Sequence, residues 1–347
     1  MKQPIRVAVV GMGIGRTNGR GFLHDPRCRV VALCDLVEDR MKDFAKEIGP
    51  DVRFYTESRA LAKDPEVDAV FVGTPNQWHV PVALEMVRAG KHVMITKPLA
   101  DSEKAAREIV SAAESAGVVN MMSLSTRFSW NVAYLGALRE KGDFGSIYFA
   151  RTRSVRRSGI PSWNLGFVEA GGGAFRDMGV HYLDSAWWLM GMPKPVRVLG
   201  VAGARFGPRG QGYWDFAPVP KEYSSRFSSD DYGCAMIRFE DGSGLQVESH
   251  WASHQPEEYN IQLFGTEAGA LLSPLTIYRT VNGAPQDSTV SPPPKVADAW
   301  DVIASHFLDC IIDHVPCRAP LRHGLEVQRI MEAVLKSAAD GREIALA

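Results

Sequence analysis

The stretch that decides the fold is Ile5-Arg6-Val7-Ala8-Val9-Val10-Gly11-Met12-Gly13-Ile14-Gly15, a short apolar run that ends in a glycine-rich turn. A strand, such a turn and a following helix let backbone N–H groups approach a pyrophosphate at the helix N-terminus. The turn alone is a weak signal in a chain with 32 glycines among 347 residues. Arg16 stands where the usual motif has its third glycine, and Gly15 is the candidate for that role.

The chain around this turn strengthens the interpretation. Asp35 ends the second predicted strand, where a carboxylate accepts hydrogen bonds from adenosine ribose hydroxyls and repels a 2'-phosphate, so NAD is favoured over NADP. The alternative is an aspartate that caps the following helix. The predicted cofactor-binding residues are Gly11, Met12, Gly13, Ile14, Gly15, Arg16, Asp35, Thr74, Pro75, Asn76, His79, Lys97 and Pro98.

Two patterns of predicted secondary structure divide the chain. Up to about residue 123, short β-branched runs alternate with amphipathic stretches, as in a parallel sheet covered by helices, with strands expected at 5–10, 30–34, 53–55, 69–73, 92–95 and 118–122. Beyond it, strand follows strand, which favours an antiparallel or mixed sheet. These later strands are expected at 148–155, 196–202, 233–239, 244–251, 259–265 and 270–280, with helices at 178–190, 297–313 and 325–339. We therefore predict an α/β doubly wound Rossmann domain over residues 1–124 and an α+β domain over residues 125–347.

Length and composition exclude several classes of protein. A chain of 347 residues with 45% hydrophobic residues is long enough for two cores. The 39 Lys and Arg against 40 Asp and Glu leave a formal charge of -1, which supplies no field for nucleic acid or an anionic membrane. Five cysteines without a C-x-x-C pair are typical of reduced thiols, and no apolar run approaches a membrane span. We expect a soluble cytoplasmic protein.

Two further segments carry chemistry. Thr74-Pro75-Asn76 with His79 follows the fourth strand, and Lys97 with Pro98 follows the fifth. Both lie at the carboxyl ends of parallel strands, where doubly wound sheets bind ligands. The ammonium of Lys97 could therefore meet a ribose or substrate oxygen, although an isolated lysine is usually just an exposed one.

The second segment runs from Gly171 to Asp184. A helix that begins near Asp177 places His181 one turn further on the same face, with Asp184 beyond it, so that this polar stripe looks into a cleft or solvent. Histidine suits proton transfer near neutral pH, and a carboxylate would orient its ring. The alternative is a capping aspartate and a histidine satisfied within the fold. The opposite face is expected to be buried through Val180, Leu183, Trp187 and Met190.

The chain resembles the Gfo/Idh/MocA oxidoreductase family, which includes glucose-fructose oxidoreductase and inositol dehydrogenase. The resemblance rests on the glycine turn, Cys34-Asp35, Thr74-Pro75-Asn76 with His79, Gly90 to Val93, Lys97-Pro98 and the Gly171 to Asp184 segment. It implies a Rossmann domain, a large and mainly antiparallel C-terminal sheet that forms the oligomer interface, a cis bond at Pro98, and a catalytic group of Lys97, Asp177 and His181. One departure is Thr96, where the family commonly has glutamate.

The resemblance further implies NAD(P)-dependent hydride transfer between nicotinamide and a secondary alcohol or ketone of a sugar, sugar derivative or polyol. In this hypothesis His181 is the base, Asp177 holds its ring and Lys97 bonds the reacting oxygen. Two alternatives stay open. The first is a tightly bound, recycled NAD, in redox-neutral glycoside cleavage or sugar–sugar oxidoreduction, and the second is a ligand-sensing regulator without catalysis.

The remaining predictions concern substrate and partners. Aromatic faces beside hydrogen-bonding groups suit a pyranose, and the predicted substrate contacts are Lys97, Arg127, Arg153, Trp163, Asn164, Asp177 and His181. The arginines between Arg151 and Arg157 fit an acidic sugar or, more commonly, a solvated strand face or interface. His250 and His254 are taken as ordinary polar structure, so no metal site is predicted. We expect a homodimer or homotetramer through the C-terminal sheet, and a lid, an arm or a plain surface loop at 205–229.

Overall fold

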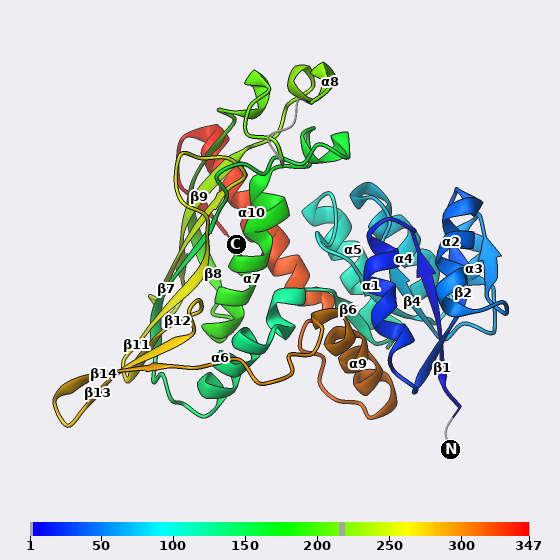
Figure 1. Ribbon diagram of the computed structural model, residues 1–347, viewed down its shortest axis with the longest axis horizontal. Helices are drawn as coiled ribbons and strands as arrows, with labels where there is room; N and C mark the ends of the chain where they lie inside the picture. The colour runs from blue at the N-terminus through cyan, green and yellow to red at the C-terminus, as the bar shows by residue number, and fades with distance from the viewer. Residues whose placement is uncertain (1–2, 215–218, 347) are drawn as a thin grey trace. The chain divides into compact units, whose positions relative to one another are not determined.

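The computed structural model describes residues 3–214 and 219–346 (Figure 1). The chain divides into two compact units. The first, here the Rossmann unit, contains the chain up to Phe128 together with Ala297–Gln328, and the second, here the sheet unit, contains Ser129–Val296 and the chain from Arg329 onward. This division differs from the expected boundary after residue 124, because the apolar face of residues 297–328, with Ile303, Phe307 and Leu308, is buried in the core of the first unit.

The Rossmann unit is built on six parallel strands in the order β3-β2-β1-β4-β5-β6. They are β1 (Ile5–Val10), β2 (Cys28–Cys34), β3 (Arg53–Tyr55), β4 (Ala69–Val72), β5 (His92–Ile95) and β6 (Asn120–Met122). All four residues of β4 are buried because helices cover both faces of a parallel sheet. The strand order reverses between β1 and β4, which is the edge where such sheets bind ligands. The doubly wound fold class is confirmed.

The helices of this unit are α1 (Ile14–Gly19), α2 (Glu38–Ile48), α3 (Ser58–Ala62), α4 (His79–Arg88), α5 (Glu103–Ser115) and α9 (Ala299–Ile312). Helix α5 shows how the sequence sets them. The Ser102 side chain accepts a hydrogen bond from the Ala105 N–H and so caps the helix, while Ala106, Ile109 and Ala113 bury one face.

The sheet unit contains a nine-stranded sheet in the order β14-β13-β12-β11-β7-β10-β9-β8-β15. Every neighbouring pair is antiparallel except β7 and β10, so the sheet is mixed and mostly antiparallel. Its strands are β7 (Ile147–Val155), β8 (Pro195–Gly203), β9 (Tyr232–Phe239), β10 (Gly244–His250), β11 (Glu258–Gly265), β12 (Ala268–Leu271), β13 (Thr276–Val281), β14 (Ala284–Thr289) and β15 (Ile344–Ala345).

The single strand expected over 270–280 is wrong. The chain turns between β12 and β13, which pair with each other through Leu271 and Thr276. Pro274 lies in this turn. Proline lacks the N–H that a continuing strand donates to its neighbour, which is why the apolar run is interrupted there.

Helices cover one face of this sheet, and α7 (Val180–Leu189) runs along it in Figure 1. The other helices of this unit are α6 (Trp130–Glu140), α8 (Lys221–Ser225) and the later part of α10 (Leu321–Asp340), within which the division between the units falls. Buried residues alternate with more exposed ones along β9 and β10, as expected when only one face is covered.

The described parts of the 205–229 stretch pack on the sheet unit. The carboxylate of Asp231 accepts the backbone N–H groups of Arg205, Phe206 and Gly207 at 2.6–3.0 Å. Tyr213 and Tyr223 join a small buried cluster. Residues 215–218 of the expected lid or arm lie outside the described residues. No helix in the described part of the chain has the length and apolar character needed to cross a membrane.

Candidate active site

The glycine turn is a point of backbone-to-backbone contact. Gly11 has a φ of +86°, and a Cβ there would lie 2.5 Å from the Gly73 carbonyl oxygen. A Cβ at Gly73 would lie 2.7 Å from Gly15 Cα. Because β1, the start of α1 and the end of β4 touch through these three glycines, Gly15 supplies the close packing that the usual third glycine provides. A Cβ at Gly13 would meet nothing within 4 Å, so its backbone is open on that side.

Asp35 holds this turn in place. Its carboxylate accepts the Met12 N–H at 2.7 Å and the Val37 N–H at 2.9 Å, and Val37 is the residue from which α2 starts. Val37 is the N-cap residue and α2 has no side-chain cap, so Asp35 orients the chain just before α2 and does not cap the helix. A carboxylate offers about four acceptor positions, so Asp35 retains capacity for a ribose hydroxyl.

Several buried polar atoms gather around the carboxyl edge of the parallel sheet. Thr74 Oγ1 and Asn76 Oδ1, after β4, have no hydrogen-bond partner among the described residues. The same holds for Ser123 Oγ, after β6, and for the side-chain amide of Asn18 on α1. Buried polar groups in folded proteins normally have partners. Thr74 and Asn76, which follow β4 at the edge where such sheets bind ligands, fit a bound dinucleotide. Asn18 and Ser123 belong to no recognisable motif, and sequence reasoning did not single them out.

His79 joins the two loops of this edge. Its Nδ1 lies 2.7 Å from the Pro98 carbonyl oxygen and its Nε2 lies 2.8 Å from that of Thr74. The ring is 1% exposed. Burial lowers the pKa of His79, whereas the two carbonyl acceptors favour the doubly protonated ring. His79 therefore fixes the β4 loop relative to the turn that carries the predicted catalytic lysine.

That lysine, Lys97, follows β5 and is partly buried. Its peptide bond to Pro98 is cis, as the resemblance implied. Thr96, which replaces the family's common glutamate, is buried, and its N–H donates to the Val72 carbonyl at 3.0 Å. The backbone of residue 96 thus remains within the sheet ladder.

In the sheet unit, a glycine turn leads into the predicted catalytic helix. Gly173 has a φ of +109°, and a Cβ there would lie 2.1 Å from an Asp230 carboxylate oxygen. Asp230 accepts the Phe175 N–H at 2.8 Å and so caps the π-helical turn η5 (Phe175–Gly179) that continues into α7. Burial raises the pKa of Asp230 to about 6. No local sequence signal identifies Asp230, because it lies 55 residues along the chain from the N–H group that it accepts.

Asp177 lies on η5 and His181 lies four residues later on α7, both partly buried. A spacing of four residues puts two side chains on one helical face. Asp177 Oδ2 accepts the indole N–H of fully buried Trp251 at 3.0 Å. The sequence predicted that Asp177, His181 and Asp184 form a polar stripe facing a cleft or solvent. Asp184 is instead 0% exposed, because nearly every residue of α7 is buried.

A row of aromatic rings leads from Trp251 to the surface. The ring centroid of Phe167 lies 6.5 Å from that of Trp251 and 5.6 Å from that of Trp163. The ring centroids of Trp163 and Trp214 are 6.1 Å apart. Trp163 is 62% exposed. Asn164, beside it, is exposed, and its side-chain oxygen accepts the N–H two residues on, which caps a short 3-10 turn. The structure thus connects Trp163 with the surroundings of Asp177.

Two predicted substrate contacts have partners within their own units. Arg127, in the Rossmann unit, is 0% exposed and donates to the Arg318 carbonyl at 2.8 Å. Arg153, on β7, forms ion pairs with Glu248 and Glu258. The residue after Glu248 donates to the carbonyl just before η5, so Glu248 and Arg153 lie on the opposite face of the sheet. Arg153 is therefore not brought together with Asp177, since the strand alternation separates them.

Three other residues are held within the fold. Arg16 forms an ion pair with Glu47 of α2 at 2.6 Å. His250 lies on β10 with its Nε2 3.6 Å from Cys234 Sγ, and His254 packs edge-on against an aromatic ring instead. The two histidines therefore have different surroundings.

The comparisons with known proteins agree with this architecture. Residues 5–124 match the family described as "Oxidoreductase family, NAD-binding Rossmann fold", and residues 132–271 match "GFO/IDH/MocA C-terminal domain". A D-glucoside 3-dehydrogenase of Escherichia coli (strain K12) is 28% identical over 99% of this chain and 98% of its own length. The scyllo-inositol 2-dehydrogenase (NAD(+)) of Bacillus subtilis (strain 168) is 23% identical over 90% of this chain and 87% of its own length.

Solved structures match along the whole chain. Levoglucosan dehydrogenase, in a complex with NADH, superposes with a TM-score of 0.85 at 20% identity, covering 99% of this chain and 100% of its own. An oxidoreductase domain protein from Kribbella flavida superposes with a TM-score of 0.86 at 20% identity, with the same coverage of both chains. The chain belongs to the Gfo/Idh/MocA family of oxidoreductases, with an NAD-binding Rossmann domain followed by the family's C-terminal domain.

Proposed function

We propose that this protein oxidises a secondary alcohol of a sugar, sugar derivative or polyol with NAD, or reduces the corresponding ketone. The observation that carries the proposal is the Asp177 carboxylate, which Trp251 holds at 3.0 Å one helical turn before His181. An imidazole beside a fixed carboxylate is the arrangement required of a general base that works near neutral pH.

The glycine turn, Asp35, Thr74 and Asn76 are the residues that would hold the dinucleotide. The close glycine contacts and the buried atoms without partners support this assignment. Asp35 favours NAD over NADP, because its carboxylate would repel a 2'-phosphate. When bound, the nicotinamide supplies a hydride acceptor or donor.

The residues of this chain would handle the proton. In the oxidation, His181 takes the hydroxyl proton while the carbon atom loses its hydride, so the alcohol becomes a ketone. Asp177 stabilises the resulting imidazolium, and the Trp251 N–H keeps the carboxylate oriented. Lys97 donates a hydrogen bond to the reacting oxygen, in the role that the family resemblance implied. Reduction reverses these steps.

A carbohydrate substrate is supported by two observations. The exposed Trp163 ring and the neighbouring Phe167 ring present the apolar faces that pack against the C–H face of a sugar. The names of the relatives, a D-glucoside 3-dehydrogenase and an inositol dehydrogenase among them, point in the same direction.

We further propose that the protein forms a homodimer or homotetramer through the open face of the nine-stranded sheet. This face carries Leu199, Val201, Met236, Phe264 and Tyr278, all exposed in the single chain. An apolar patch of this kind is typical of an interface. A stable monomer in light scattering at working concentrations would contradict it.

All five cysteines are free thiols, which supports a cytoplasmic location.

The test is a turnover screen of the full chain with NAD and a panel of monosaccharides, glycosides, sugar acids and polyols. We expect reduced nicotinamide with at least one of them, and a loss of about 10²- to 10⁴-fold in His181→Ala. The control is His24→Ala, whose side chain is 64% exposed and pairs with Asp301. Anaerobic denaturation reveals a cofactor that is reduced but retained, the signature of the recycling alternative. Ligand binding without any cofactor reduction would instead indicate the regulator.

A further inference from the structure

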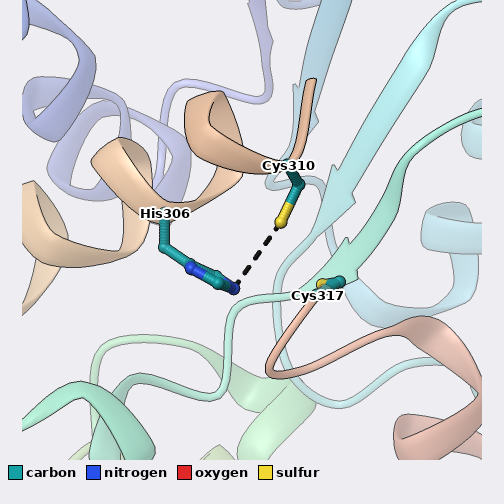
Figure 2. Close-up of side chains that lie close together, drawn as sticks. All are labelled: His306, Cys310 and Cys317. Carbon is teal, nitrogen blue, oxygen red and sulfur yellow. Dashed lines mark hydrogen bonds between the residues drawn. The ribbon is translucent and has the colours of Figure 1, made fainter. Parts of the chain in front are cut away.

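A second cluster of reactive side chains lies in the Rossmann unit. His306 and Cys310 project from α9, and Cys317 follows in the segment between α9 and α10. Figure 2 shows the His306 ring and the Cys310 thiol directed toward each other with Cys317 beside them. One ligand atom from each residue lies within 4.8 Å of the others. No other group of three or more His, Cys, Asp or Glu residues within residues 3–214 and 219–346 has such a geometry.

The distances suit a tetrahedral metal. With a Zn–S bond of about 2.3 Å and a Zn–N bond of about 2.0 Å, tetrahedral angles place a nitrogen and a sulfur about 3.5 Å apart and two sulfurs about 3.8 Å apart. His306 Nε2 and Cys310 Sγ are 3.6 Å apart. The 4.8 Å limit means that the two sulfurs would need to approach by at most about 1 Å, and the His306 nitrogen and Cys317 sulfur by at most about 1.3 Å.

The donor set is also selective. Two thiolates with one imidazole favour Zn²⁺ over the hard cations Mg²⁺ and Ca²⁺. His306 and Cys310 are four residues apart on one helix, so they share a face and a fixed separation. We propose that His306, Cys310 and Cys317 bind Zn²⁺, with the fourth coordination position taken by water.

The surroundings orient the imidazole. The Arg318 backbone N–H donates to His306 Nε2 at 2.9 Å, so this nitrogen is unprotonated and carries a lone pair, as a metal ligand must. The His306 ring also packs against the Phe128 ring, with 5.4 Å between the ring centroids. Metal binding replaces the Arg318 hydrogen bond, and the freed N–H lies next to Cys317 in the chain. One backbone hydrogen bond is weak compared with thiolate coordination.

Zinc at this position would tie α9 to the edge of the parallel sheet. The Ala319 carbonyl, two residues after Cys317, accepts the Met122 N–H of β6 at 2.8 Å. The Arg318 carbonyl accepts a bond from Arg127. Binding of Zn²⁺ to the folded state should therefore raise the thermal midpoint of the protein.

The experiment uses the full chain, reduced and stripped of metal, titrated with Co²⁺ and then Zn²⁺. We expect one Co²⁺ per chain, with a cysteinate-to-cobalt charge-transfer band and the visible spectrum of tetrahedral cobalt, both lost when Zn²⁺ displaces it. Cys317→Ser should abolish the charge-transfer intensity from that sulfur and weaken binding at least tenfold.

The control is Cys234→Ser. Cys234 Sγ also lies 3.6 Å from a histidine Nε2, that of His250, but among the described residues this pair belongs to no group of three possible metal ligands. This variant should bind Co²⁺ like the wild type. X-ray absorption of the zinc-loaded wild type, which requires no variant to fold, should show two sulfur neighbours and two nitrogen or oxygen neighbours.

Three results would overturn the proposal. They are a wild type without the cobalt spectrum, a spectrum unchanged in Cys317→Ser, and a Cys310–Cys317 disulfide that forms in air while the reduced protein binds no metal. The last result would identify a redox-active thiol pair instead.

Discussion

The substitution Asp230→Asn tests how the predicted catalytic helix begins. Asp230 caps η5 through the Phe175 N–H, and burial raises its pKa from 3.8 to about 6. A raised carboxyl pKa stabilises the fold below pH 4, where the group is protonated in both states, and this contribution is lost as the pH rises through about 6. A difference of about two pKa units corresponds to about 3 kcal/mol.

Asparagine is neutral at every pH and keeps an oxygen that can accept the Phe175 N–H. We therefore expect Asp230→Asn to unfold at higher denaturant concentration than the wild type at pH 7.5, by up to about 3 kcal/mol in the free energy of unfolding, with the gap closing toward pH 4. The assay is urea unfolding across this pH range, with exposed Asp287→Asn as the control. A gap that does not change with pH would refute the reasoning.

Three further predictions concern the predicted cofactor-binding residues and the predicted catalytic helix. Gly73→Ala should lower the thermal midpoint, since its Cβ would lie 2.7 Å from a backbone atom. Gly13→Ala, whose Cβ would meet nothing within 4 Å, should fold normally and weaken NAD binding at least tenfold by calorimetry. Equal changes in thermal midpoint for the two variants would contradict this. Trp251→Phe removes a hydrogen bond to a carboxylate, about 1.5–3 kcal/mol, so kcat/KM should fall about 10- to 100-fold, and an unchanged value would exclude a role in orienting Asp177. His79→Ala leaves two buried carbonyls unpaired and should lower the free energy of unfolding by about 2–4 kcal/mol; a loss below about 1 kcal/mol would show that its ring does not join the two loops.

Sequence reasoning succeeded where a signal is local. The strand and glycine turn at residues 5–15 determine the first βαβ unit, and the alternation of buried runs predicted all six parallel strands. The run at 270–280 misled because Pro274 interrupts the ladder inside an otherwise strand-like stretch.

The parts that escaped prediction depend on contacts distant in sequence. Trp251 and Asp230 fix the helix that carries Asp177, although each lies more than 50 residues away from it. The sequence suggested a substrate contact for Arg127, but its guanidinium contacts the Arg318 carbonyl and the His323 ring, which come from the chain beyond residue 317. Likewise, the spacing of His306, Cys310 and Cys317 matches no familiar metal motif.

The most direct test of the proposed chemistry is deuterium transfer. A substrate deuterated at its secondary carbinol carbon is incubated with the full chain and NAD, the protein is denatured anaerobically, and the released cofactor is analysed by mass spectrometry. The account predicts deuterium in the reduced nicotinamide for the wild type and a large loss of the transfer rate in His181→Ala. A cofactor without deuterium for every alcohol that the protein binds, or equal transfer rates in the two proteins, would contradict it.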